Sequence, residues 1–219
     1  MKSINGIDWK INNIPERLIL KNMQIYNISY LLSKIFLEKK YTDDEIYSSI
    51  YNSKDIAINY INTDFEKAGK LISKNLKSHK KILIFGDYDV DGTTGSSALY
   101  LFLNSIDCDA KIYIPHRISE GYGLSVKGIN NAIEWGANLI ISCDCGINAI
   151  QEVAYAKSKG LDIIVTDHHT PDTNLPAADA IINPNQTDCQ YPFKGLCGGA
   201  VIFKLMQAVS KLLNLHDQF

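Results

Sequence analysis

The sequence predicts an α/β protein, with a parallel sheet that has helices on both faces and a helical N-terminal extension before it. From residue 81 onward, short apolar runs alternate with stretches of helical spacing, which is typical of βαβ units. Three of these apolar runs end in carboxylates or histidines. Because the carboxyl ends of parallel strands meet at one edge of the sheet, we expect these polar ends to form a single site.

The expected strands are the apolar runs 82–86, 110–114, 138–143, 161–166 and 179–182. Helical spacing covers 93–104, 125–135 and 147–159, and an apolar helix begins near Gly198. Crossovers between parallel strands are right-handed.

Residues 1–79 are the expected N-terminal extension, and 80–219 the expected catalytic-type domain. Helical spacing at 21–38 and again at 64–76 indicates helices that pack against the sheet, with Trp9 as a packing anchor. No linker rich in glycine, serine or proline separates the two parts, so we expect one α/β domain with a helical preface.

The first expected strand ends in the segment GDYDVDG, where Asp87, Asp89 and Asp91 alternate with other residues. If strand geometry continued, all three carboxylates would face the same way, and a divalent cation would relieve their repulsion. A solvated turn or a calcium loop is the alternative, but Thr93, Thr94 and an apolar run follow here. A nucleotide-binding turn is disfavoured because GxGxxG is absent.

Two further strands end in ligand-type residues. The run IVTDHH ends at Asp167, His168 and His169, and LIISCDCG ends at Asp144. Imidazole is a common ligand for manganese, iron and zinc, although a lone histidine pair is more often structural. Three strands with such ends predict a metal site at the sheet edge.

These motifs also carry a family resemblance. GDYDVDGTTG, EGYGL, SCDCG and TDHH, in that order, resemble the DHH phosphoesterase superfamily, and in particular its RecJ branch of single-strand-specific 5′-to-3′ DNA exonucleases. The resemblance runs from about residue 80 to about residue 206 and includes NPNQTDCQYPFKGLCGGAVIFKL. It implies metal-dependent phosphodiester hydrolysis that serves DNA repair and recombination.

The resemblance also implies roles for single residues. Asp144 corresponds to a carboxylate that bridges two metals, and His169 to a histidine that faces the scissile phosphate. Asp87 and Asp167 are expected to orient their neighbours. The implied metal ligands, which together with His169 are the expected catalytic residues, are Asp89, Asp91, Asp144 and His168.

The expected cofactors are two divalent metal ions. Manganese fits a mixed carboxylate and imidazole set better than magnesium, which could substitute poorly. Phe85 stands where other branches of the superfamily have a histidine ligand, so we expect one metal to be held more weakly.

Candidate phosphate-binding residues lie in other loops. Arg117 could pair with a phosphate, or instead with Glu120 on the surface. Gly198 and Gly199 precede an apolar helix, whose free N–H groups could hold an anion, although a simple tight loop is the alternative. Ala200 replaces the glycine that is usual in the family.

Composition limits the class of protein. With 219 residues and 46% hydrophobic content, the chain can bury a normal core, and no apolar run is long enough to span a membrane. Five cysteines and no secretory signal favour a reducing compartment, the cytoplasm. Cys143 and Cys145 flank Asp144, but without a CxxC pair a zinc–thiolate site is disfavoured. A net charge of −2 argues against a DNA-coating protein, but not against a nuclease whose acidic site binds metals.

The family's fourth motif is expected beyond the helix near Gly198, and the chain reaches Phe219 without it. Asp217 is discounted as a substitute because no apolar strand precedes it. We therefore expect the N-terminal portion of a longer, monomeric exonuclease that acts on single-stranded DNA with a 5′ end, and that contacts a single-strand-binding protein through its missing part. The alternatives are an oligonucleotide or cyclic-dinucleotide phosphodiesterase, or an inactive DHH domain that binds nucleic acid or a partner.

Overall fold

The computed structural model describes residues 13–51 and 63–215. Its contacts divide the chain into two compact units, Met1–Ile58 and Asn59–Phe219, and each unit is considered by itself. Trp9 and Asp217, for which the sequence raised expectations, lie outside the described residues. No helix among those described is both long and apolar enough to cross a membrane.

The N-terminal unit contains the helices α1 (Glu16–Tyr26), α2 (Tyr30–Glu38) and α3 (Asp43–Tyr51). The helical spacing over 21–38 is divided between α1 and α2, because Asn27 adopts a left-handed conformation with φ of 51° and ends α1. Ser29 then caps α2 by accepting a hydrogen bond from the Leu32 N–H. The three helices bury a small cluster of their own, formed by Tyr26, Phe36 and Ile46.

The second unit is built on five parallel strands in the order β2-β1-β3-β4-β5. All five were expected from the apolar runs, within one residue at each end. Their bounds are β1 Ile82–Gly86, β2 Ala110–Tyr113, β3 Leu139–Cys143, β4 Asp162–Thr166 and β5 Ala180–Ile182.

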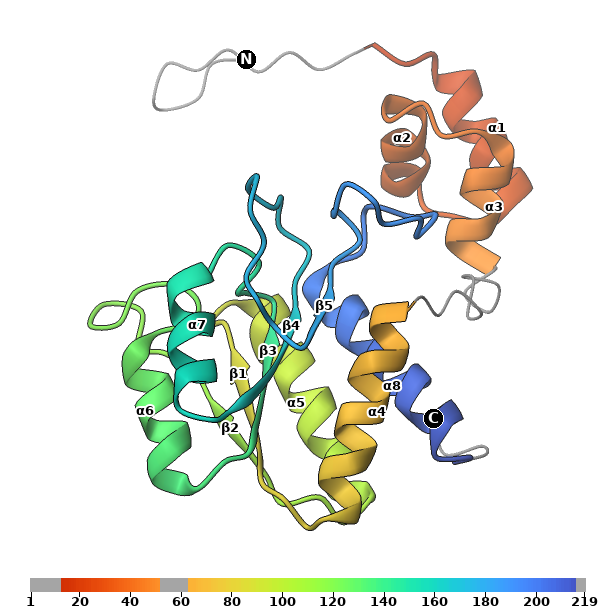
Figure 1. Ribbon diagram of the computed structural model, residues 1–219. Helices are drawn as coiled ribbons and strands as arrows, with labels where there is room; N and C mark the ends of the chain where they lie inside the picture. Colours follow the sequence, from red (N-terminus) through yellow and green to blue (C-terminus); the bar gives the residue numbers. More distant parts are fainter. Residues whose placement is uncertain (1–12, 52–62, 216–219) are drawn as a thin grey trace. The chain divides into compact units, whose positions relative to one another are not determined.

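Helices cover both faces of this sheet, as predicted (Figure 1). Side chains alternate along each strand, so Ile82 and Ile84 face one layer while Leu83 and Phe85 face the other. The first layer contains α4 (Thr63–Lys77), α5 (Val90–Ser105) and α8 (Gly198–Leu212), and the second contains α6 (Val126–Trp135) and α7 (Ile150–Ser158).

The helix α4 belongs to the sheet unit. It packs against α8 and β5, and Phe65, Ala68 and Ile72 enter the same core cluster as the strands. The contacts therefore place the boundary between the units at residue 58, whereas composition placed it at residue 79.

The strand order creates a crevice at the carboxyl edge of the sheet. From β1 the chain passes through α5 to β2 on one side, and then returns through α6 to β3 on the other side of β1. The loops after β1 and β3 therefore leave in opposite directions, and ligands bind at such a switch point in open α/β sheets. The two loops carry Asp87, Asp89 and Asp144.

Candidate metal centre

The acidic segment after β1 is a tight turn into a helix. The strand ends at Gly86, and Asp89 caps α5 by accepting a hydrogen bond from the Gly92 N–H at 3.0 Å. Strand geometry does not continue through Asp91, because the cap starts the helix at Val90. Asp87 and Asp89 still share one group with Asp144, in which carboxylate oxygens lie within 4.8 Å of one another.

Asp144 follows β3 directly and is buried, with 1% of its surface exposed. Its backbone has a φ of 65°, a left-handed conformation that bends the chain at the end of the strand. Neither carboxylate oxygen accepts a well-formed hydrogen bond from the described residues. Burial, together with the charges of Asp89 and Asp91, raises the pKa of Asp144 to about 7. A buried carboxylate in this state requires a proton or a cation.

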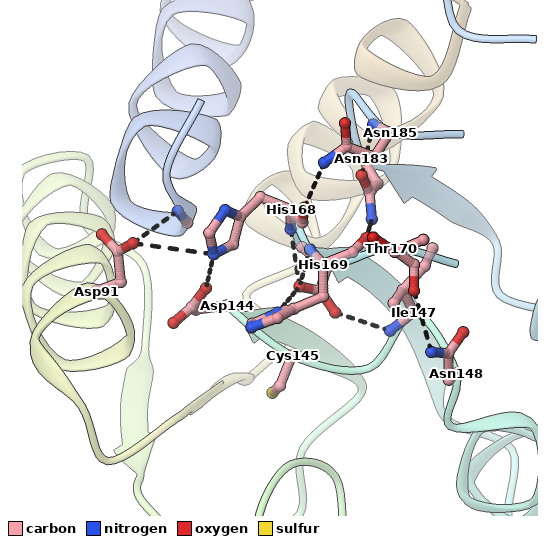
Figure 2. Close-up of polar contacts among 12 residues, drawn as sticks. Asp91, Asp144, Cys145, Ile147, Asn148, His168, His169, Thr170, Asn183 and Asn185 are labelled. Carbon is pink, nitrogen blue, oxygen red and sulfur yellow. Dashed lines mark hydrogen bonds and ion pairs between the residues drawn. The ribbon is translucent and has the colours of Figure 1, made fainter. Parts of the chain in front are cut away.

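His168 follows β4 and places its imidazole beside the carboxylate of Asp144. Its Nε2 lies 3.1 Å from Asp144 Oδ1 and 3.9 Å from Asp91 Oδ2, so the three side chains converge (Figure 2). Such an arrangement of two carboxylates and an imidazole nitrogen is a ligand set for a divalent transition metal.

Asp91 is held by the N-terminus of α8. Its carboxylate accepts hydrogen bonds from the N–H groups of Gly198 and Gly199 at 3.2 and 3.3 Å. Burial acts to raise the pKa of Asp91, but hydrogen bonds from the Cys197 thiol and these N–H groups, with the charge of His168, lower it overall. The anion at this helix end is thus Asp91, and an external phosphate would have to share these N–H groups with it.

Asp167 organises the histidine pair. It is buried, and its Oδ1 accepts hydrogen bonds from the N–H groups of His168 and His169 at 2.7 and 3.1 Å. The same oxygen lies 2.7 Å from His169 Nδ1, while Oδ2 accepts a hydrogen bond from the Ile147 N–H at 2.9 Å. Burial acts to lower the pKa of His169, but the hydrogen bond and charge of Asp167 outweigh it and raise that pKa. Because Nδ1 faces a carboxylate, Nε2 is the nitrogen left for a ligand.

Three further side chains hold this edge in place, and sequence reasoning assigned no role to them. The Tyr122 hydroxyl donates to the Asp144 carbonyl oxygen at 3.0 Å and lies 3.2 Å from His169 Nδ1. Asn183 donates to the His169 carbonyl oxygen at 2.9 Å, and Asn185 donates to that of His168. All three lie in segments already quoted as family-like, EGYGL and NPN, which was the available signal.

Asp87 lies beside the carboxylates of Asp89 and Asp144, where a metal ligand would lie. It is buried, and its Oδ1 has no hydrogen-bond partner among the described residues. Burial raises the pKa of Asp87 even though the N–H groups of Tyr88 and Asp89 act in the opposite direction. Its carboxylate could therefore bind a metal directly.

The cysteines on either side of Asp144 point elsewhere. Cys143 Sγ lies 3.7 Å from the Gly92 carbonyl oxygen, and Cys145 Sγ lies 3.8 Å from that of Phe85. Burial raises the pKa of Cys143 to about 12, which disfavours the thiolate that a zinc site needs. Neither cysteine joins the metal-type groups found among the described residues.

Arg117 lies outside the cluster of carboxylates. It is exposed, and its guanidinium stands 5.2 Å from the centre of the Tyr88 ring. The ion pair with Glu120 that we considered is not formed, since Glu120 instead binds Lys127 at 3.2 Å and accepts a hydrogen bond from the Tyr113 hydroxyl. Arg117 thus has no carboxylate partner within the described part of the chain.

The residues present fit a divalent metal. Three buried carboxylate oxygens without hydrogen-bond partners, one on Asp87 and two on Asp144, face a shared region with Asp89 and His168. Leaving such oxygens unpaired would cost several kcal/mol each by the usual scale for buried charges, roughly the penalty that a bound cation removes. The fold and this site together define a parallel α/β domain with a carboxylate–histidine metal centre.

Comparisons with known proteins agree with this description. The model of the DHH family, N-terminal domain, matches residues 81–218, and the chain therefore belongs to the DHH family. It is 34% identical to the single-stranded-DNA-specific exonuclease RecJ of Bacillus subtilis over 203 residues, 92% of this chain and 26% of that protein. It is 42% identical to RecJ of Escherichia coli over 155 residues, 70% of this chain and 27% of that protein.

A solved structure of exonuclease RecJ bound to manganese is also similar. It shares 32% sequence identity with a TM-score of 0.66, and the match covers 72% of this chain and 40% of that one. The chain thus spans about a quarter of the length of the curated relatives it matches.

Proposed function

We propose that this chain carries the metal-dependent catalytic centre of an exonuclease that hydrolyses phosphodiester bonds in single-stranded DNA from a 5′ end. The observation that supports this most directly is Asp144, a buried carboxylate with two unpartnered oxygens that faces Asp89, Asp91 and His168. The relatives that share this segment are single-stranded-DNA-specific exonucleases, and one similar structure is bound to manganese.

In this proposal two divalent metal ions, manganese in preference to magnesium, bind Asp89, Asp91, Asp144 and His168, with Asp144 between them. Asp87 adds a buried oxygen to this set. Divalent metals at such a site lower the pKa of a water and neutralise charge on phosphoryl oxygens.

The remaining groups position the substrate. Asp167 fixes His169 through Nδ1, so Nε2 is directed to the phosphate, and the raised pKa of His169 favours the cationic, donating form of the ring. Arg117 is an exposed cation 5.2 Å from the centre of the Tyr88 ring and is proposed to hold a second phosphate. Gly198 and Gly199 act first on Asp91, and contact phosphate only where it shares their N–H groups.

Four further points stay predictions. They are the 5′-to-3′ direction of hydrolysis, a reducing cytoplasmic location, a monomeric state and an interaction with a single-strand-binding protein. None of them is needed for the metal centre itself.

The experiment is a hydrolysis assay on the 219-residue chain at high concentration, with 5′-phosphorylated single-stranded DNA and its duplex form as substrates. We expect at most a slow release of mononucleotides from the single strand in manganese, none in EDTA, and none from Asp144→Asn, whose amide keeps the shape of the side chain without its charge. Glu134→Gln, an exposed change on α6, is the matched control. Manganese-dependent hydrolysis of cyclic dinucleotides but not of DNA would overturn the proposal.

A further inference from the structure

A cleft opens on the side of the histidine pair away from Asp91. It has a volume of about 380 Å³, and its walls include Tyr122 and His169. In Figure 2, Ile147 and Asn148, which also line it, lie beyond His169 as seen from Asp91. Clefts of a few hundred cubic ångströms are the usual size for small organic ligands.

The floor of the cleft is apolar. Leu124 and Ile147 are buried there, and Ala149 lies beside them. Gly146, with a φ of 105°, keeps the floor open, because a Cβ at this position would lie 3.0 Å from the Leu124 side chain. Such a surface favours a flat apolar group over a charged one.

Charge points to the same conclusion. The lining includes the carboxylates of Glu152 and Asp167, and no lysine or arginine among the described residues. Its one cationic group is His169, which lies at the edge shared with the metal centre and which we assign to the phosphate. Beyond His169 the carboxylates would repel a phosphate, so a nucleotide whose phosphate lies at the metal centre would place its neutral part in the cleft.

Tyr122 supplies an aromatic wall whose orientation is fixed. Its hydroxyl is held by Asp144 and His169, and its ring meets that of Tyr88 nearly at right angles, at 84° and 6.5 Å between centroids. The side chain is nevertheless 52% exposed. A ring that is held at its tip and edge while its surface stays open can stack on a base without losing side-chain freedom.

We propose that this cleft is the subsite for the nucleoside whose 5′-phosphate lies at the metal centre, and that the base stacks on Tyr122. The inference rests on the proposed function for the position of the phosphate. Asn148 already uses both ends of its amide, toward the Thr170 carbonyl oxygen and the Asp172 N–H, and so does not read the base. The subsite is therefore tolerant of base identity.

The experiment is calorimetric titration of the 219-residue chain in manganese with three probes: inorganic phosphate, deoxyribose 5-phosphate and a deoxynucleoside 5′-monophosphate (dTMP or dAMP). Since stacking on one aromatic side chain corresponds to about 5- to 150-fold in affinity, we expect both mononucleotides to bind about tenfold more tightly than deoxyribose 5-phosphate. Tyr122→Leu should remove this base-dependent gain, and Tyr122→Phe, which keeps the ring but lacks the hydroxyl, should retain it.

A second variant tests the cleft without touching Tyr122. Ala149→Leu adds a bulky side chain to the lining of the cleft and should also remove the gain, while the affinity for inorganic phosphate stays unchanged. Equal binding of dTMP and deoxyribose 5-phosphate by the wild type, or a gain that survives in both Tyr122→Leu and Ala149→Leu, would overturn the inference. A gain that persists although manganese strengthens the binding of no probe would support the cleft and overturn the proposed function instead.

Discussion

Gly198 lies directly against the carboxylate of Asp144. A Cβ at position 198 would stand 2.2 Å from Asp144 Oδ1 and 2.7 Å from Asp144 Cβ. The two residues come from the N-terminus of α8 and the end of β3, so this contact joins two distant segments at the centre. At Gly199 an added Cβ would meet nothing closer than Asp91 Oδ1 at 3.4 Å, an ordinary contact.

Gly198→Ala should therefore displace Asp144 and weaken manganese binding, whereas Gly199→Ala should not. Displacement of a group that supports a metal site typically costs about 10- to 100-fold in metal affinity, and we expect a loss of that size for Gly198→Ala. Calorimetric titration with manganese, with circular dichroism as a check of folding, makes the comparison. Equal affinities for the two variants would show that the contact has no influence on the centre.

A second prediction concerns the number of bound ions. If Asp144 serves both metals while Asp89 serves one, Asp144→Asn should abolish binding of two manganese ions, and Asp89→Asn should leave one. Asparagine is the appropriate replacement at position 144, because it tolerates the left-handed backbone that this position requires. Anomalous scattering from manganese counts the ions. Two ions in the Asp144→Asn protein would mean that Asp144 does not lie between them.

The strands and the gathering of their polar ends could be predicted from the sequence because both depend on local patterns. Apolar runs of four to six residues with polar ends give β1, β3 and β4, and parallel topology alone brings Asp87, Asp144 and His168 to one edge.

What could not be predicted depends on single backbone conformations and on contacts between distant segments. The cap formed by Asp89 turns the chain into α5 three residues before the expected helix, and Asn27 divides the helical spacing of 21–38 between two helices. Asp91 accepts a hydrogen bond from the Gly198 N–H, 107 residues away, and no sequence pattern in either segment indicates this contact.

The metal-free protein should lose stability as pH rises from about 4 to about 7. The pKa of Asp144 is about 7 in the folded chain and near 3.8 otherwise, so folding favours the protonated form and its contribution declines as the carboxyl ionises. The raised pKa of His169 acts in the same direction, since that stabilisation is lost as pH rises through the folded value. The loss from Asp144 is at most about 4 kcal/mol.

Urea denaturation in EDTA measures this dependence. Asp144→Asn should be more stable than the wild type near pH 8 and nearly equal to it near pH 4, because the amide does not ionise. Manganese should restore the wild type near pH 8 and should not stabilise Asp144→Asn. A wild type that gains stability toward pH 8 without metal would contradict the unpartnered state of this carboxylate.

Asn183 offers a test of the support beneath the histidine pair. Its buried side chain donates to the His169 carbonyl oxygen and accepts from the Asn185 N–H at 2.7 Å. Asn183→Ala leaves both groups without this partner and should lower the free energy of unfolding by about 1 to 3 kcal/mol. Asn130→Ala, at an exposed position on α6 where Asn130 accepts a hydrogen bond from Tyr155, is the matched control. An equal, small effect for both would show that the Asn183 contacts contribute little.

The last prediction separates the two histidines. Each histidine has a ring nitrogen within 4.8 Å of an Asp144 carboxylate oxygen, so either could share a metal with it. Only His169 contacts Asp167 through Nδ1. The His169 side chain is also 47% exposed and lines the cleft. We assign it to the phosphate, so His169→Ala should lower the rate of DNA hydrolysis by about 10² or more and leave manganese affinity nearly unchanged. His168→Ala, whose Nε2 faces Asp144 and Asp91, should instead lose manganese affinity together with activity. Titration with manganese and the release of mononucleotides, measured on the same preparations, distinguish the two effects. A parallel loss of metal in His169→Ala would make His169 a ligand, and Asp167 would then act as the partner that orients it on the metal.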